Sequence, residues 1–268
     1  MADPVQKVPS RQNLRNTLGL AREFGFLEFN TLDHTLWDDD FMGDTFFGGY
    51  QTTQNGSGAA APAMTEAANG TIAMVTGSAD GGRTDLSLGL SYSPSLNAVI
   101  AARIKVSSIA TVKMEIGFTD VLSGTDAGAV DNADTTTFSA TDCAVWCFDT
   151  DDTTDVWRTS STYDAHSSSS VWTSTETGFA PVADTYETLI VALEGVNTAE
   201  GATATNPSTA HFYRLDANGY QTYKSAPITT GPTSNITLTP WLFVQNRTSS
   251  TRTMTVDFLK VWQRRTAS

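Results

Sequence analysis

The chain has 268 residues, with 16 Lys and Arg against 29 Asp and Glu, which gives a formal net charge of -13 at neutral pH. Binding to phosphates needs clustered basic side chains, so this charge argues against a nucleic-acid-binding protein. No apolar run reaches the roughly 18 residues of a membrane-spanning helix, and the N-terminal residues lack the pattern of a signal peptide. We therefore expect no membrane partner and no export by the usual route.

Hydrophobic residues make up 40% of the chain and charged residues 17%, which is enough apolar surface for a sizeable core. The many Thr, Ser and Gly residues favour short strands and turns over helices. A β-sandwich of this length commonly forms one domain. The composition thus predicts a single all-β domain.

Residues 1–33 differ from the rest of the chain and are predicted to form an N-terminal arm. An N-cap at Ser10, apolar residues four apart and a stop at Gly25 indicate a short helix over residues 11–23. The basic side chains form either a solvated face or a cationic surface that docks on an acidic partner. These side chains are Lys7, Arg11, Arg15 and Arg22.

From Trp37 onward the period of the sequence changes to two, as in half-buried antiparallel strands. An opening strand is expected near residues 39–50, and we interpret the triplet Asp38, Asp39 and Asp40 as its solvated edge rather than as a metal or catalytic site. Further strands are predicted at residues 84–92, 99–108, 111–118, 186–193, 239–245 and 254–262.

Two later segments give more local predictions. In the last strand, Met254, Val256, Phe258 and Trp262 are expected to share one buried face. The pair at residues 218–219, Asn-Gly, predicts a hairpin turn between aromatic-rich strands.

Cys143 and Cys147 are four residues apart, which is about 13 Å along an extended strand and too far for a disulfide. We interpret them as buried, reduced thiols, which fits folding in a cytoplasm. A metal or redox role is the alternative.

Several segments follow one another in the order of a known pattern. They are AVIAARIKVSS, VKMEIGFTD, GFAPVADTYETLIVALE, AHFYRLDANGYQTYKSAPI and TMTVDFLKVWQRR. Together they resemble the concanavalin A-like lectin/glucanase (laminin G-like) jelly roll, in the form found in tailed-phage virion proteins. The resemblance covers roughly residues 37–265. It implies an antiparallel β-sandwich domain over residues 34–268, preceded by the arm.

The glucanase branch of this resemblance implies paired carboxylates on one strand, about 5 Å apart. The segment VKMEIGFTD offers only Glu115 and Asp120, and their odd spacing puts them on opposite faces of a strand. The histidines, His34, His166 and His211, lack the spacing of a zinc site. We therefore expect no enzyme activity and no cofactor.

The segment FDTDDTTD holds a second acidic cluster, formed by Asp149, Asp151, Asp152 and Asp155. Asp-rich loops bind calcium in legume-type lectins of the resembled fold, so calcium is one alternative here. The segment lacks the glycine and the distal glutamate of an EF-hand loop. A solvated acidic turn is the preferred interpretation.

Four tryptophans, Trp146, Trp157, Trp172 and Trp241, can stack on sugars if they are exposed. Trp157 and Trp172 flank the loop that carries Tyr163 and His166. The predicted glycan-binding set is therefore Trp157, Tyr163 and Trp172. The alternative is that the tryptophans fill the core.

The missing carboxylate pair, the basic arm and the phage-like jelly roll together favour a non-enzymatic virion protein. The preferred hypothesis is a decoration or cement protein on the capsid exterior, assembled in the host cytoplasm. It would dock on the major capsid protein partly through residues 1–33, and form a homo-oligomer such as a trimer. The alternative is a carbohydrate-binding tail or fibre module that attaches the particle to host-surface glycans.

Overall fold

A computed structural model describes residues 34–42, 49–65, 70–121, 128–132, 134, 137–164, 172–195 and 206–265. The predicted arm and its helix lie outside these ranges, as does His166. Within the described ranges, no helix is long and apolar enough to span a membrane.

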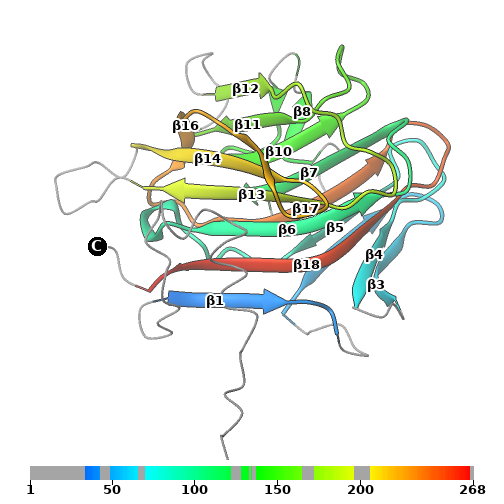
Figure 1. Cartoon of the computed structure of the whole chain (residues 1–268), viewed down its shortest axis with the longest axis horizontal. Coiled ribbons are helices and arrows are strands. Elements are labelled where there is room, and N and C mark those ends of the chain that lie inside the picture. Colours follow the sequence, from blue (N-terminus) through cyan, green and yellow to red (C-terminus); the bar gives the residue numbers. More distant parts are fainter. Residues whose placement is uncertain are drawn as a thin grey trace, which may run out of the picture.

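Two antiparallel sheets lie face to face (Figure 1). Sheet A has nine strands, in the order β15-β14-β13-β6-β18-β4-β3, with β1 also paired to β18 and β16 also paired to β14. These strands are β1 (His34–Asp39), β3 (Ala60–Thr65), β4 (Thr71–Val75), β6 (Val99–Val106), β13 (Glu187–Glu194), β14 (Pro207–Leu215), β15 (Gln221–Lys224), β16 (Ile228–Thr233) and β18 (Thr253–Arg264).

Sheet B has seven strands, in the order β12-β11-β10-β7-β17-β5-β2. They are β2 (Gln51–Asn55), β5 (Arg83–Ser87), β7 (Val112–Thr119), β10 (Cys143–Asp149), β11 (Arg158–Thr162), β12 (Trp172–Glu176) and β17 (Thr239–Asn246). A separate ribbon consists of β8 (Val130–Asn132) and β9 (Thr137–Phe138), and a single 3-10 turn, η1 (Pro94–Leu96), precedes β6. The architecture confirms the predicted all-β sandwich.

The core lies between the two sheets, because every second side chain of each strand points inward. Trp146 is at its centre, fully buried, with ring centroids 6.1 Å from Trp157 and 5.7 Å from Phe212. The indole nitrogen of Trp146 donates a hydrogen bond to the carbonyl of Ile190 across the two sheets, at 3.0 Å. Burial of the tryptophan ring therefore leaves no unpaired donor.

The start of the sandwich differs from the prediction. The first described strand, β1, begins at His34, so Asp38 and Asp39 lie within a strand rather than ahead of one. Asp38 forms an ion pair with Lys260 of β18 at 2.9 Å, and Asp39 accepts a hydrogen bond from the hydroxyl of Tyr50 at 2.9 Å. Asp38 thus stabilises the pairing of β1 with β18, and Asp39 stabilises the turn that follows β1, as charges at a sheet edge do.

The last strand also differs from the prediction. Its pairing with β6 shifts register between Val256 and Phe258, as a β-bulge does. Val256 packs in the core between the sheets, whereas Phe258 and Trp262 belong to an apolar cluster on the other face of sheet A. A strict period of two could not reveal the extra residue.

Two local predictions are confirmed. The hairpin between β14 and β15 turns at residues 216–220, where Gly219 has a φ of 83°, which a glycine adopts without strain. Cys143 and Cys147 are free and fully buried on β10.

Leu242 of β17 is fully buried, so its replacement by alanine leaves a cavity in the core. We expect Leu242→Ala to lower the free energy of unfolding by about 2–5 kcal/mol in urea titrations. Leu90, which is 39% exposed, is the matched control, and Leu90→Ala should change it by less than about 1 kcal/mol. Equal losses at both positions would contradict this core.

Candidate functional site

The outer face of sheet B is the place to look for a site, because its side chains alternate with those of the core. β7 is the central strand of this sheet, and Glu115 projects from its outer face. Asp120 follows the end of β7 and accepts a hydrogen bond from the backbone of Thr141, at 3.2 Å. The two carboxylates are therefore engaged separately.

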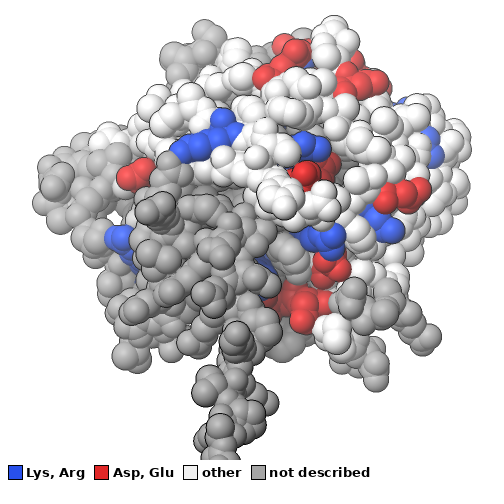
Figure 2. All heavy atoms as spheres, in the orientation of Figure 1, with Lys and Arg blue, Asp and Glu red and all other residues white. Residues whose placement is uncertain are grey.

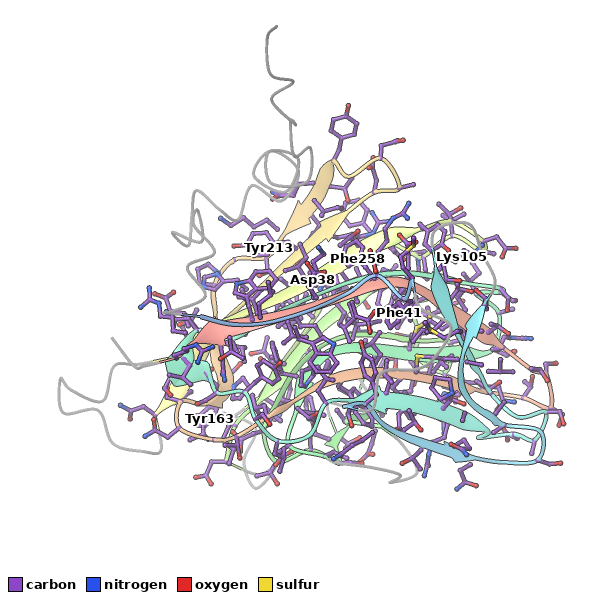
Figure 3. All side chains as sticks on the ribbon, turned by 90° about the horizontal axis from the view of Figure 1, so that it is seen from below. Asp38, Phe41, Lys105, Tyr163, Tyr213 and Phe258 are labelled. Carbon is purple, nitrogen blue, oxygen red and sulfur yellow. The ribbon has the colours of Figure 1, made fainter. Side chains whose placement is uncertain are left out.

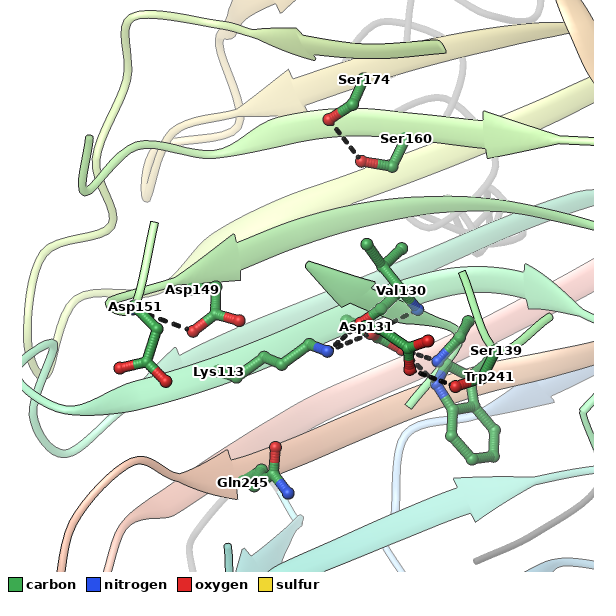
Figure 4. A network of polar contacts seen from close by, with 12 residues as sticks. Lys113, Val130, Asp131, Ser139, Asp149, Asp151, Ser160, Ser174, Trp241 and Gln245 are labelled. Atoms are coloured by element: carbon green, nitrogen blue, oxygen red, sulfur yellow. Dashed lines mark hydrogen bonds and ion pairs between the residues drawn. The ribbon is translucent and has the colours of Figure 1, made fainter. Parts of the chain in front are cut away.

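Glu115 is fully buried, and its carboxylate binds groups of other segments, among them Val130 and Trp241, which Figure 4 shows beside Lys113. The backbone N–H groups of Ala129 and Val130 donate hydrogen bonds to it at 2.7 and 3.0 Å, and the Trp241 indole donates a third at 2.9 Å. The ammonium of Lys113, also fully buried, lies 3.2 Å from the carboxylate and donates to the carbonyl of Val130. Such a network compensates the buried charge.

Gly128 makes this close approach feasible. A Cβ at this position would lie 2.6 Å from a carboxylate oxygen of Glu115, and the backbone has a φ of 86°. Only glycine meets both conditions without strain. The segment that follows, residues 129–132, is therefore fixed on the sheet by backbone contacts to one side chain.

The ribbon of β8 and β9 seals the centre of the outer face with apolar side chains. Val130 and Phe138 of the ribbon pack in one cluster with the three sheet residues Val145, Trp241 and Phe243. Cys143 and Cys147 are part of the same cluster, and burial raises the pKa of both thiols. Reactive or metal-bound thiols need the opposite shift, so the structural role predicted for them fits this geometry.

The flank of the outer face, formed by β11 and β12, is polar: β11 is buried along its whole length, and the edge strand β12 is half-buried to exposed. Ser160 and Ser174 lie opposite each other with their hydroxyl oxygens 3.1 Å apart. Trp172 is half-buried at the edge of the central cluster and pairs with Thr162, which directly precedes Tyr163. The strand register thus brings two of the three predicted sugar-binding aromatics to the same end of this strand pair.

The third predicted aromatic, Trp157, is in the wrong place for sugar binding. It is fully buried between the sheets, and its indole donates a hydrogen bond to Glu187 at 3.0 Å. Trp146 and Trp241 are buried as well, so they offer no ring face to solvent. The prediction that Trp157 is exposed is wrong, because this tryptophan precedes β11 rather than belonging to its outer face.

The acidic segment after β10 is held by arginines. Asp149 forms a bidentate pair with Arg247, and Asp151 lies 3.3 Å from the same guanidinium. Asp152 is buried 3.2 Å from Arg158, while Asp155 is exposed. Among the described residues no group of His, Cys, Asp or Glu is arranged to hold a metal. These carboxylates therefore do not fit a calcium ion.

The side chain of His211, in β14, is buried and lies 3.4 Å from Glu194 of β13. Both strands belong to sheet A, whereas Glu115 belongs to sheet B.

Comparison with solved structures identifies the fold. A protein of unknown function from Shewanella oneidensis MR-1 superposes with a TM-score of 0.57 at 12% identity, covering 88% of this chain and 89% of the other. The Lotus tetragonolobus seed lectin gives a TM-score of 0.53 at 8% identity, covering 87% and 100%. The fold is that of the concanavalin A-like lectins and glucanases.

A third similar structure comes from a phage. The CBM2 module of the evolved Dit of Lactobacillus casei phage J-1 superposes on this concanavalin A-like chain with a TM-score of 0.52 at 12% identity, covering 88% of this chain and 98% of the module. In sequence, the chain matches no protein-family model and no curated protein. The likeness is therefore one of fold.

Removal of the Glu115 carboxylate should take away the counter-charge of the buried Lys113 ammonium and the acceptor that holds the ribbon of β8 and β9. We expect Glu115→Ala to lower the free energy of unfolding by about 3–5 kcal/mol, measured by urea denaturation. The exposed Glu194 is the control, and Glu194→Ala should cost less than about 1 kcal/mol. A loss for Glu115→Ala no larger than that of the control would refute the buried network.

Asp152 should make stability depend on pH. Burial, and then the nearby Asp149 and Asp134, raise the pKa of Asp152 to about 6, against about 3.9 in an unfolded chain. Between these values the folded chain holds a proton that the unfolded chain does not, so this group's stabilising contribution is present at low pH and is lost as pH rises through about 6.

The wild type should therefore lose stability relative to the Asp152→Asn variant as the pH rises from 4 to 7. The unfolding free energy of the variant minus that of the wild type should increase over this range. Urea titrations at several pH values measure this difference. Asp155→Asn, in the same acidic segment but exposed, controls for the loss of one charge. A difference for Asp152→Asn that stays constant across the range would contradict the assignment.

Proposed function

We propose that this chain is a non-enzymatic carbohydrate-binding module that holds glycans at the edge formed by β12 and the end of β11. The observation that carries the proposal is the pairing of Thr162 with Trp172, which puts the half-buried Tyr163 and Trp172 at one end of a strand pair. The edge strand of this pair, β12, is half-buried to exposed and carries the hydroxyl of Ser174. Aromatic rings stack on the apolar faces of sugars, and hydroxyl groups bond their polar edges.

The similar structures support a carbohydrate ligand. One is a seed lectin, and another is named as a CBM2 module. Because identities of 8 and 12% establish the fold alone, the ligand class rests on the local geometry as well. A shallow, polar, aromatic-edged surface suits a glycan better than a deep apolar pocket would.

The proposed lack of catalysis follows from the state of Glu115. A glycosidase needs one carboxyl to donate a proton and a second carboxylate about 5–9 Å away, both open to the sugar. Glu115 is fully buried and accepts three hydrogen bonds, so its oxygens cannot reach a glycosidic bond. The ribbon of β8 and β9 packs over this carboxylate and the neighbouring apolar side chains of sheet B.

We further propose that the module belongs to a phage tail or fibre and attaches the particle to host glycans. The phage-derived Dit module among the similar structures supports this setting. The capsid-decoration hypothesis depends on Lys7, Arg11, Arg15 and Arg22, which lie outside the described residues, so it stays a prediction. The same holds for the major capsid protein as a partner and for the homo-oligomer.

A glycan array followed by titration tests the proposed site. We expect binding to at least one glycan, and about a tenfold loss of affinity for Trp172→Ala and for Tyr163→Ala, because each removes a stacking ring. Tyr220, which is 72% exposed at the β14–β15 turn, provides the control, and Tyr220→Ala should bind as wild type does. Urea unfolding confirms that each variant is folded.

The absence of any glycan binding at millimolar concentration would remove the proposal. Unchanged affinity in both Trp172→Ala and Tyr163→Ala would keep carbohydrate binding but place it elsewhere on the molecule.

A further inference from the structure

Sheet A carries an apolar cluster on the face that points away from sheet B. Tyr213 and Phe258 lie on this side in Figure 3, above the ribbon of sheet A. We call the seven buried side chains of this cluster the outer cluster, and each of the seven is at most 4% exposed. Its members are Val99, Ala101, Ile190, Ala192, Tyr213, Leu215 and Trp262, with Phe258 packed against them.

Burial of the outer cluster requires a cover that the described strands do not supply. The strands that contact β6 and β13 most extensively are their neighbours in sheet A and strands of sheet B, which lie beside or behind the cluster. The outer face of an antiparallel sheet is usually polar and solvated. Seven apolar side chains there indicate that a further segment packs on sheet A.

We propose that residues 11–32 of this chain bind the outer cluster and form a third layer on sheet A. The described chain enters the fold at His34, which pairs with Arg264, and two residues later Leu36 pairs with Trp262 of the outer cluster. The preceding residues therefore emerge at one edge of the cluster. No long linker is needed for them to cross it.

The dimensions agree with this placement. The outer cluster runs from β18 through β6 and β13 to β14, and β1 adds a fifth strand at its edge. Five strands with about 4.8 Å between neighbours span roughly 19 Å. A helix over residues 11–23 would be about 20 Å long at 1.5 Å per residue. One such helix, or the extended residues 24–32, spans the whole cluster.

The composition of the segment also fits an apolar surface. Within residues 11–32 the large apolar side chains are Leu14, Leu18, Leu20, Phe24, Phe26, Leu27, Phe29 and Leu32. The other undescribed segments that adjoin strands of sheet A suit it less. Residues 196–205 read VNTAEGATAT, residues 66–69 read EAAN, and residues 266–268 are too few, while residues 43–48 hold two large apolar side chains against eight in residues 11–32. Burial of large side chains on both surfaces stabilises such packing.

Charges beside the outer cluster favour an apolar occupant over an acidic partner. Arg103 is paired with Asp257 at 2.5 Å, and Lys260 is paired with Asp38 at 2.9 Å. In the space-filling view, basic and acidic side chains lie near one another over the described part of this face (Figure 2). These two basic groups are already neutralised, which favours apolar contact with the cluster beside them.

This placement changes the role predicted for the arm. A segment packed on its own sheet buries the apolar side chains of the arm, whereas a capsid-docking arm must be free to leave. The glycan-binding flank lies in sheet B, so a cover on sheet A leaves that flank open.

A thiol placed in the middle of the outer cluster tests the cover in the full chain. Ala101 lies between Ile190 and Lys260 in the sheet, and the native cysteines are fully buried and add little background. We expect Ala101→Cys to react with a polyethylene glycol maleimide at least about tenfold more slowly than Ser249→Cys, whose position is exposed. The double change Phe26→Asp and Phe29→Asp should abolish this protection.

The change Asn13→Asp with Asn16→Asp adds the same charge without removing an apolar side chain, and it should preserve the protection. A chain that lacks residues 2–32 should lose the protection of the thiol at position 101. If that chain does not fold, the variant with Phe26→Asp and Phe29→Asp still tests the proposal. Fast labelling of Ala101→Cys in the otherwise unaltered chain would overturn the proposal. So would protection that survives the deletion, including protection that grows with protein concentration, which would indicate a second copy as the cover.

Discussion

The structure depends on one constraint, which is that the central strands of both sheets are buried on both faces. β7, β10 and β17 are buried along their whole length, and β13 is buried at all but its last residue. A two-layer sandwich buries only the inner face of each sheet. Each outer face therefore requires a cover of its own, and those covers decide which surfaces remain for a ligand.

On sheet B the cover is short and is held by a single carboxylate. The ribbon of β8 and β9 contributes few apolar side chains, and Glu115 fixes it through two backbone N–H groups. The same interaction explains why the centre of this face has no open carboxylate. The part of this flank that stays partly open is the edge strand β12, where the half-buried Trp172 packs against the sealed centre.

On sheet A the same constraint leads to the proposed third layer. With such a layer on sheet A, the half-buried edge strand β12 of sheet B, with Trp172, would stay uncovered. The proposed glycan site and the proposed third layer therefore belong to different sheets.

The sequence by itself determined several local features, because these follow from neighbours in the chain: the period of two determined β6, β7, β13 and β17, the Asn-Gly pair the hairpin at Gly219, and the spacing of Cys143 and Cys147 their free thiols. It also selected Tyr163 and Trp172, but not the strand register that brings them to one end of β11 and β12. The bulge before Phe258, the burial of Trp157 and the network of Glu115 were decided by tertiary structure. Each depends on which distant segment lies alongside, as for Glu115 and Trp241, 126 residues apart.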